Sequence, residues 1–351
     1  MKTDLLISLL CVAVSCSGAA TADMPAWRWE DPQPPVEEPF QDPWPAMIEK
    51  GWTNVTEALL GSHGDIEIYR SPDTIDGNRT VAYVAAASLS VVKWDVRSID
   101  DPSIQGTTDA LRTPSDWYAE GAVPVLVNGG YFFSEGGKNY NASVAVSAGR
   151  TYGVNINYAS LDWETMYYPT RGVFYQDEGA APAVGWTYWS GGARHYLYDA
   201  PAENSWEAAP LQVPDAGFPV KGRDFAPQTA IGGGPVLLKD GEIVNSWQAE
   251  LLYGDGADDK MPKARHPRTA IGYTGDGRLV LFVCEGRGMT DGVAGMTFAE
   301  EAALLKDLGC TDALNLDGGG SSCLLAAGKE TIKPSDGKQR AVSSVIVLQS
   351  K

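Results

Sequence analysis

Apolar and alternating apolar–polar runs recur along most of the chain and predict β-strands. Two short glycine-containing segments, residues 239–242 and 274–277, lie between such runs and predict hairpin turns. Most neighbouring strands are therefore expected to pair in antiparallel fashion. The runs that we assign to strands are residues 80–84, 89–96, 123–127, 230–238, 279–284 and 342–348.

One segment carries the signals of a helix. Thr297 and Glu300 have the spacing of a capping box, an apolar face follows from Ala302 to Leu308, and Gly309 suits the helix end. The helix joins the strand at 279–284 to a strand before residue 315, a crossover that predicts two neighbouring strands. We expect an α+β fold: a single domain, residues 47–351, with a mixed, largely antiparallel sheet flanked by helices.

The N-terminal segment has the pattern of an export signal. Lys2 precedes an apolar run at 5–14 that is too short to span a bilayer. The following Ser-Cys-Ser-Gly predicts a lipoprotein signal, residues 1–16, with Cys16 as the lipidated residue. Cleavage near Ala19 and plain secretion are the alternative. Residues 17–46, rich in proline, acid and tryptophan, read as a tether. We expect an exported protein, a cell-envelope lipoprotein or else periplasmic or secreted, that meets a membrane only through this anchor.

Charge and cysteine content narrow the classes of function. The net charge is -18, which argues against binding to nucleic acid or anionic lipid, although a local arginine cluster can still hold an anion. The body has three cysteines, Cys284, Cys310 and Cys323, each in or beside an apolar run. We interpret them as small buried hydrophobes, with a disulfide between two of them as the alternative.

Residues 161–206 are unusually rich in tyrosine and tryptophan and predict an insertion in the domain. The aromatic side chains either pack this segment onto the body or form a wall on which sugar rings stack. Packing is the preferred interpretation.

The segment Asn315–Ser322 concentrates the groups that can do chemistry. A carboxylate, Asp317, and two hydroxyls flank three glycines where one apolar run ends and another begins. Glycine lets the backbone turn tightly and lets a ligand approach its N–H groups. We place the active site here.

Six short blocks follow one another between residues 123 and 348. They are NGGYF at 128–132, AIGGGPVL with DG at 230–241, HPRTAIG at 266–272, GMTFAE at 295–300, NLDGGGSS at 315–322 and RAVS at 340–343. In this order they resemble the phosphodiester glycosidase family, and the ordered set is more specific than any single block. The sequence departs from the family pattern at Glu285, where an aspartate is usual, so the carboxylate is one methylene longer.

The resemblance implies cleavage of the bond between a sugar anomeric carbon and a phosphodiester oxygen. Asp317 is the first candidate for the catalytic carboxylate and Glu285 the second. Arginines suit the phosphate because guanidinium binds oxyanions through two hydrogen bonds. The candidates for binding sugar or phosphate are Arg268, Arg340, Arg287, Asn128, Asn315, Gly318, Gly319, Gly320, Ser321 and Ser343. Each has a structural alternative, such as an ion pair or a turn contact.

Other chemistries stay open or are disfavoured. With three histidines, a histidine-rich metal site is not expected, and we predict no cofactor, leaving calcium open. His266, beside Arg268, is a structural residue or a general acid. The expected partner is a carbohydrate or glycophosphate substrate. The alternatives to a glycosidase are a non-catalytic glycan-binding lipoprotein and a phosphodiesterase that cleaves the P–O bond.

Overall fold

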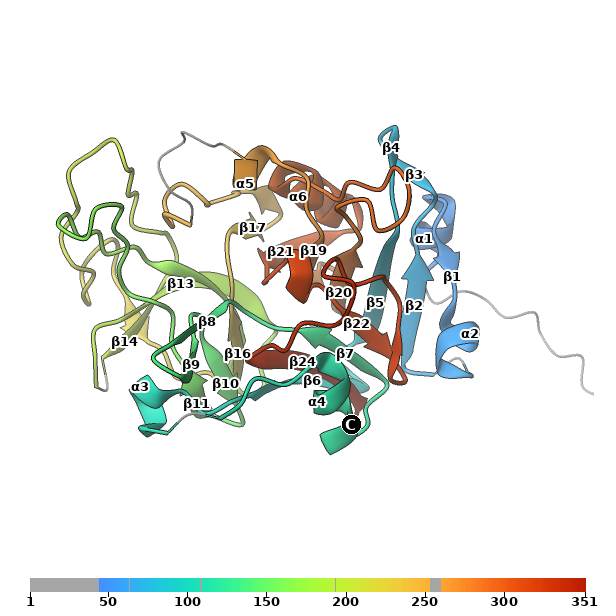
Figure 1. Cartoon of the computed structure of the whole chain (residues 1–351), viewed down its shortest axis with the longest axis horizontal. Helices are drawn as coiled ribbons and strands as arrows, with labels where there is room; N and C mark the ends of the chain where they lie inside the picture. The colour runs from blue at the N-terminus through green and yellow to red at the C-terminus, as the bar shows by residue number, and fades with distance from the viewer. Residues whose placement is uncertain (1–43, 63, 108, 193, 253–259) are drawn as a thin grey trace, which may run out of the picture. The chain divides into compact units, whose positions relative to one another are not determined.

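The apolar runs assemble into several antiparallel sheets (Figure 1). The computed structural model describes residues 44–351 except 63, 108, 193 and 253–259, and the described chain belongs to one compact unit. The predicted signal, Cys16 and nearly all of the predicted tether lie outside the described residues. Within the part described, no helix is long and apolar enough to cross a membrane.

The largest sheet has eight strands and brings together segments that lie far apart in the sequence. In spatial order they are β1 (Thr53–Asn54), β2 (Ile66–Arg70), β5 (Ala82–Ser88), β20 (Arg278–Cys284), β19 (Arg268–Thr274), β21 (Cys310–Asn315), β17 (Val236–Lys239) and β18 (Glu242–Ile243).

Two further sheets pack with it. The seven-stranded sheet has the order β11 (Arg150–Gly153), β10 (Ala145–Ser147), β16 (Thr229–Gly232), β12 (Arg171–Gln176), β13 (Ala183–Trp189), β14 (His195–Tyr198), β15 (Arg223–Asp224). The five-stranded sheet has the order β23 (Lys329–Glu330), β22 (Leu324–Ala326), β7 (Val125–Asn128), β24 (Ser344–Ser350), β6 (Val92–Ser98). Two ribbons, β3 (Thr74–Ile75) with β4 (Asn78–Arg79) and β8 (Phe132–Glu135) with β9 (Lys138–Asn141), complete the strands described.

The described helices are short. The longest, α6 (Phe298–Asp307), begins at the predicted capping box: the Thr297 hydroxyl accepts the Glu300 N–H, and the Glu300 carboxylate accepts the Thr297 N–H. The others are α1 (Pro45–Glu49), α2 (Thr56–Leu60), α3 (Pro102–Gln105), α4 (Pro114–Glu120), α5 (Lys260–Lys263) and the 3₁₀ turn η1 (Gly319–Ser321).

Strand β20 shows why the core needs sheets on both sides. Successive side chains of a strand point to opposite faces. Leu281 joins the cluster that β6, β7 and β24 complete, whereas Phe282 joins the cluster under α6, and both are fully buried. A strand buried on both faces reads as a continuous apolar run, as residues 279–284 do.

The expected fold class, a helix-flanked α+β domain, is wrong. The molecule is mostly β, with several sheets and a half-barrel. The reason is that strands from different sheets pack against one another and bury the core, where helices were expected. The predicted strand 230–238 is in fact two strands, β16 and β17, in different sheets, separated by Gly233, Gly234 and Pro235. Glycine and proline interrupt strands, so this break had a signal in the sequence.

The predicted crossover is also wrong in one respect. Strands β20 and β21 do not pair, because β19 lies between them and bonds antiparallel to both. The two predicted hairpins, β17–β18 and β19–β20, are confirmed.

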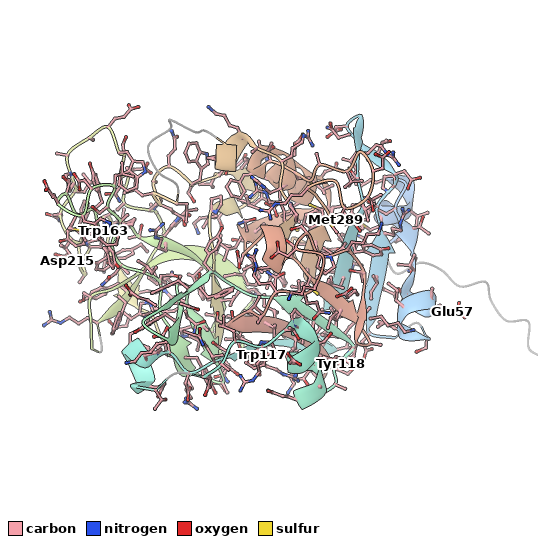
Figure 2. All side chains as sticks on the ribbon, viewed as in Figure 1. Glu57, Trp117, Tyr118, Trp163, Asp215 and Met289 are labelled. Carbon is pink, nitrogen blue, oxygen red and sulfur yellow. The ribbon has the colours of Figure 1, made fainter. Side chains whose placement is uncertain are left out.

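The aromatic segment supplies sheet strands. Strand β12 pairs with β13 and β16, and Phe174 and Trp186 lie in the main core. Tyr188 and Tyr198 are buried as well, in agreement with the packing interpretation. Trp163, which is 77% exposed, is an exception at the surface (Figure 2).

Candidate active site at the triple-glycine turn

The triple-glycine turn connects two sheets. Strand β21 of the eight-stranded sheet ends at Asn315, and β22 of the five-stranded sheet begins at Leu324. Between them, Gly319 has a φ of 60°, a left-handed conformation that favours glycine. The turn therefore lies where the ends of strands from both sheets meet, which is where side chains from distant segments can converge.

Asn128, at the end of β7, holds the turn in place through buried hydrogen bonds. Its side-chain N–H donates to the Asp317 carbonyl at 2.7 Å, and its oxygen accepts from the Thr269 hydroxyl at 2.9 Å and the Cys323 N–H at 3.1 Å. The side chain is fully buried. These contacts support a structural role rather than contact with a sugar hydroxyl.

Asn315 is buried too and bonds mainly to backbone. Its side-chain N–H groups donate to the carbonyls of Gly234 and Leu316, each at 2.7 Å, and to the Tyr131 hydroxyl at 3.1 Å. Its side-chain oxygen is buried and has no hydrogen-bond partner. Asn315 therefore joins the turn to the residues around Tyr131.

The three glycines let charged side chains lie directly on the backbone. A Cβ at Gly319 would come within 2.7 Å of the Arg287 guanidinium. A Cβ at Gly320 would overlap both Arg340 and Asp336, and one at Gly318 would come within 2.8 Å of the Pro267 carbonyl. The predicted Arg340 and Arg287 thus do converge on the turn that carries Asp317.

Asp317 is a half-buried carboxylate in this cationic setting. Burial raises its pKa to about 6, against the opposing effects of a hydrogen bond from Ser321, the charge of Arg340 and the Gly318 N–H. A carboxylate with a pKa near neutrality can accept a proton or attack an electrophilic carbon.

Asp336 is a site residue that sequence reasoning missed. Its carboxylate accepts from Nε and Nη2 of Arg340 at 3.0 and 2.7 Å, and lies 3.9 Å from Nη1 of Arg287. Arg340 also donates to the Ser321 hydroxyl at 3.4 Å. The sequence did contain a signal for this ion pair, because Asp336 comes four residues before Arg340 of the closing block.

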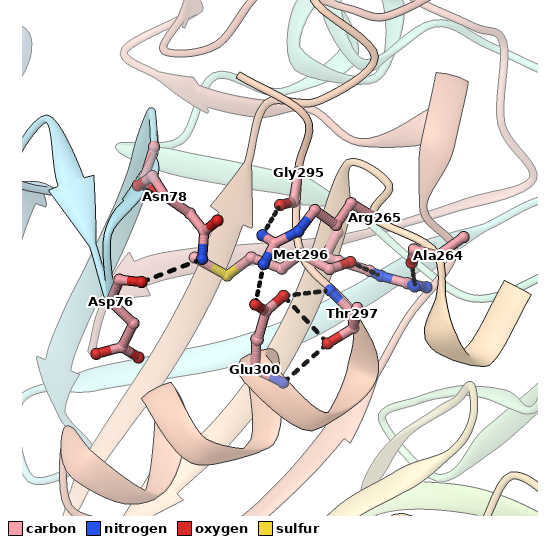
Figure 3. A network of polar contacts seen from close by, with 10 residues as sticks. Asp76, Asn78, Ala264, Arg265, Gly295, Met296, Thr297 and Glu300 are labelled. Atoms are coloured by element: carbon pink, nitrogen blue, oxygen red, sulfur yellow. Dashed lines mark hydrogen bonds and ion pairs between the residues drawn. The ribbon is translucent and has the colours of Figure 1, made fainter. Parts of the chain in front are cut away.

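The backbone of Arg268 lies beside Gly318, but the contacts of its side chain are made elsewhere. Its guanidinium donates to the carbonyls of Met296 and Ala264, at 2.9 and 3.1 Å, and packs 3.9 Å from the centre of the Phe298 ring. It is 3% exposed. Figure 3 shows the neighbouring contacts, in which Glu300 caps α6 and pairs with Arg265. This geometry favours the structural alternative for both Arg268 and Glu300.

Two other predicted residues are enclosed by protein. Glu285 is 3% exposed, and one carboxylate oxygen accepts the Lys333 N–H at 2.9 Å while the other has no partner. It thereby holds the segment that leads to Asp336 and Arg340. The Ser343 hydroxyl is buried and has no hydrogen-bond partner among the described residues.

His266 contributes a neutral imidazole to the neighbourhood. Burial, followed by the charges of Arg268 and Arg287, lowers its pKa. Both ring nitrogens are buried and lack hydrogen-bond partners. At neutral pH this side chain is therefore mainly the neutral imidazole, not the imidazolium that would serve as a general acid.

No group of three or more histidine, cysteine or acidic side chains forms a potential metal site in the part of the chain that the structure describes. The three cysteines are free and buried, as the preferred interpretation predicted.

The family can now be identified from comparisons with known proteins. Residues 121–349 match the model of the phosphodiester glycosidase family. The prophage-derived uncharacterized protein YomE of Bacillus subtilis is 39% identical over 84 residues, 24% of this chain and 13% of YomE. Mouse N-acetylglucosamine-1-phosphodiester α-N-acetylglucosaminidase is 31% identical over 123 residues, 32% of this chain and 23% of the mouse protein. The matches thus span less than a quarter of either relative.

Solved structures share the fold. The zebrafish N-acetylglucosamine-1-phosphodiester α-N-acetylglucosaminidase catalytic domain, auto-inhibited by its pro-peptide, matches with a TM-score of 0.55 and 20% identity, over 83% of this chain and 85% of that one. A hypothetical protein from Synechocystis matches with a TM-score of 0.52 and 15% identity, over 82% and 62% of the two chains. Because the family model covers well over half of the sequence, the chain belongs to the phosphodiester glycosidase family.

Proposed function

We propose that the protein is a glycoside hydrolase that cleaves the glycosidic bond of sugar-1-phosphodiesters. The observation that carries this proposal is the convergence of Asp317, Ser321, Arg340 and Arg287 on the triple-glycine turn. Membership of the family supports a reaction on phosphodiester-linked sugars. A substrate resembling a GlcNAc-1-phosphate diester, or a related surface glycan, fits this proposal.

The arginines are proposed to hold the phosphate. As the glycosidic bond breaks, negative charge builds on the departing phosphodiester oxygen, and fixed cations stabilise that charge. Arg340 and Arg287 already lie on the glycine backbone, with Asp336 between them as their present counter-ion. Asp336 fixes the direction of both guanidinium groups, and a bound phosphate would share their remaining N–H groups.

Asp317 is proposed to act on the sugar side of the bond. An ionised carboxylate can attack the anomeric carbon or remove a proton from the attacking water. Phosphodiester is a good leaving group and needs little protonation, which agrees with a neutral His266 beside the site. The charge stabilisation comes from arginine side chains, so we propose a reaction without a cofactor, and activity should persist after dialysis against EDTA.

The test is cleavage of a panel of α-GlcNAc-1-phosphate diesters and aryl glycosides by the purified protein in ¹⁸O-labelled water. Glycosidase chemistry places the isotope in the sugar product. Isotope in the phosphate product would instead identify a P–O-cleaving phosphodiesterase. Binding of the panel without turnover, under conditions in which a family enzyme cleaves it, would leave a glycan-binding protein.

We also propose export to the cell envelope with Cys16 as the lipid-bearing residue. The support is the sequence pattern of residues 1–16 alone. In a bacterial host, Cys16→Ser should move the protein from the membrane fraction to the soluble fraction, whereas Cys323→Ser should not. An unchanged membrane fraction for Cys16→Ser would contradict the anchor.

A further inference from the structure

A pocket lined by Arg171 lies beside the glycine-rich segment that precedes β17. Its volume is about 140 Å³, and we call it the Arg171 pocket. Among the residues that the structure describes, its lining has one cationic side chain and no carboxylate, although the whole chain is strongly acidic. The residues that matter for its chemistry are Tyr131, Ser143, Asn155, Arg171, Gly233 and Leu252.

Arg171 has hydrogen-bonding capacity to spare. In the described part of the chain its guanidinium makes one hydrogen bond, from Nη1 to the Glu250 carbonyl, and no salt bridge. The Glu250 carboxylate lies nearby but is occupied by other donors, among them the Gly172 N–H at 2.9 Å and the Val236 N–H at 3.1 Å. Burial lowers the pKa of Arg171 to about 10, still far above neutrality, so the side chain remains charged.

Ser143 adds a neutral donor. Its oxygen accepts the Tyr131 N–H at 3.0 Å, and its own O–H has no acceptor within the residues that the structure describes. The Asn155 amide, by contrast, is used: it donates to the Thr187 hydroxyl at 2.8 Å and accepts the Val144 N–H at 2.9 Å. The guanidinium of Arg171 and the hydroxyl of Ser143 thus line a small cavity whose described lining carries no carboxylate, while the charge of the buried Glu250 also acts on Arg171.

The pocket adjoins the candidate active site. The Tyr131 hydroxyl, on its wall, donates to the Gly234 carbonyl at 2.7 Å and accepts from Asn315 at 3.1 Å. Asn315 and Asp317 are two residues apart, and the Asp317 N–H donates to the Gly129 carbonyl at 3.1 Å. Short backbone segments therefore connect the Arg171 pocket to the catalytic candidate.

We propose that the Arg171 pocket binds a small oxyanion, a carboxylate or phosphate group of the substrate, in addition to the phosphodiester held at the glycine turn. Arg171 would bind two oxygens of the group and Ser143 would donate a third hydrogen bond. This inference rests on the proposed function and narrows it: the substrate is a sugar phosphodiester that carries a second acidic group.

The test uses inorganic phosphate and acetate as probes of the full chain, with chloride at equal ionic strength as the reference, followed by calorimetry and ³¹P NMR. Arg171→Gln should weaken probe binding at this pocket about tenfold or more, and Ser143→Ala about threefold. Arg171→Lys keeps the charge but not the paired hydrogen bonds, so its affinity should lie between those of the wild type and Arg171→Gln, which separates loss of charge from misfolding. Arg150→Gln, a surface control, should change nothing.

The variant Arg340→Gln distinguishes probe binding at the glycine turn from probe binding in the Arg171 pocket. Binding that is lost in Arg340→Gln but kept in a folded Arg171→Gln would overturn the proposal. Stronger binding of acetate than phosphate would identify a carboxylate subsite, and the reverse a phosphate subsite.

The probe experiment does not require turnover. Asp317→Asn should therefore still bind the probes at the Arg171 pocket. If the probes bind there but no substrate of the panel is cleaved, the pocket stands and the proposed reaction fails. If substrates are cleaved but Arg171→Gln binds the probes as tightly as the wild type, the reaction stands and the pocket fails.

Discussion

At the scale of single residues, the site depends on a carboxylate, Asp317, whose pKa is raised by burial and lowered by its polar neighbours. Burial disfavours the charged form of Asp317, whereas Arg340, Ser321 and the Gly318 N–H favour it. The sequence named Asp317, Arg340 and Arg287 as candidates, and the structure brings all three to one turn, where the glycines let side chains approach the backbone closely. Nothing in the sequence indicated that Arg268, in an equally prominent block, packs on Phe298 instead.

Asp317 should titrate near pH 6, because burial raises its pKa above the ordinary 3.8. Activity that needs the ionised carboxylate should fall below about pH 6. Arg340→Gln removes a charge that lowers this pKa, so the midpoint should move upward. The measurement is ¹³C NMR of labelled aspartate carboxyls, with Asp317→Asn to assign the signal.

The same shift has a consequence for stability. A carboxyl whose pKa is raised on folding contributes stability that is fully present below about pH 4 and is lost as the pH rises through about 6.

The control for the titration of Asp317 is Arg150→Gln, at the surface pair with Asp100, which should leave the Asp317 midpoint unchanged. A wild-type midpoint near 4, or one insensitive to Arg340→Gln, would contradict the assigned environment.

Asn128→Ala should destabilise the protein by about 3 kcal/mol, because it leaves the Asp317 carbonyl, the Thr269 hydroxyl and the Cys323 N–H without a buried partner. Urea denaturation gives the free energy of unfolding. Asn78→Ala, which removes a local contact to the Asp76 carbonyl in a surface turn, is the matched control and should change it little. Equal effects of the two substitutions would count against the role of Asn128.

At the scale of elements, local signals were predictable and sheet membership was not. The capping box of α6 and the turns of the β17–β18 and β19–β20 hairpins depend on residues close in sequence, so the sequence predicts them. Whether a strand joins one sheet or another depends on partners far along the chain, as for β16 and β17. Asp336 was missed for the same reason, since its role depends on a turn nearly twenty residues earlier.

The triple-glycine turn should tolerate no side chain at its third glycine. Gly320→Ala would place a methyl group where Arg340 and Asp336 now lie, and would push the guanidinium off the turn. A misplacement of about 1 Å at a catalytic site can reduce turnover about a hundredfold. The measurement is kcat/KM on whichever panel substrate is cleaved. Gly64→Ala, where nothing lies within 4 Å of an added methyl, is the control and should keep wild-type activity.

At the scale of the whole molecule, the site is assembled across sheets, so its precision depends on how the sheets are joined. The turn links the eight- and five-stranded sheets, and the Arg171 pocket lies beside the chain that passes from β16 to β17. Glu250 is the buried polar residue that ties these parts together. Its carboxylate accepts from Gly172 on β12, Val236 on β17, the Trp186 indole at 3.2 Å and the Ser246 hydroxyl at 2.5 Å.

Glu250→Ala should therefore cost more than loss of a single contact. It removes the acceptor of the Gly172 N–H and the Trp186 indole N–H, whereas Val236 and Ser246 keep their hydrogen bonds to each other. A loss of about 3–5 kcal/mol in the free energy of unfolding is expected. The substitution keeps the Glu250 carbonyl that accepts Arg171 but removes a carboxylate whose charge acts on Arg171, so the folded variant should bind phosphate at the Arg171 pocket at least as tightly as the wild type. Urea denaturation and the phosphate titration measure the two effects in one variant. Glu57→Ala, at an exposed position on α2, is the control. A free energy of unfolding close to that of Glu57→Ala would show that apolar packing alone joins the sheets and that Glu250 contributes little to stability.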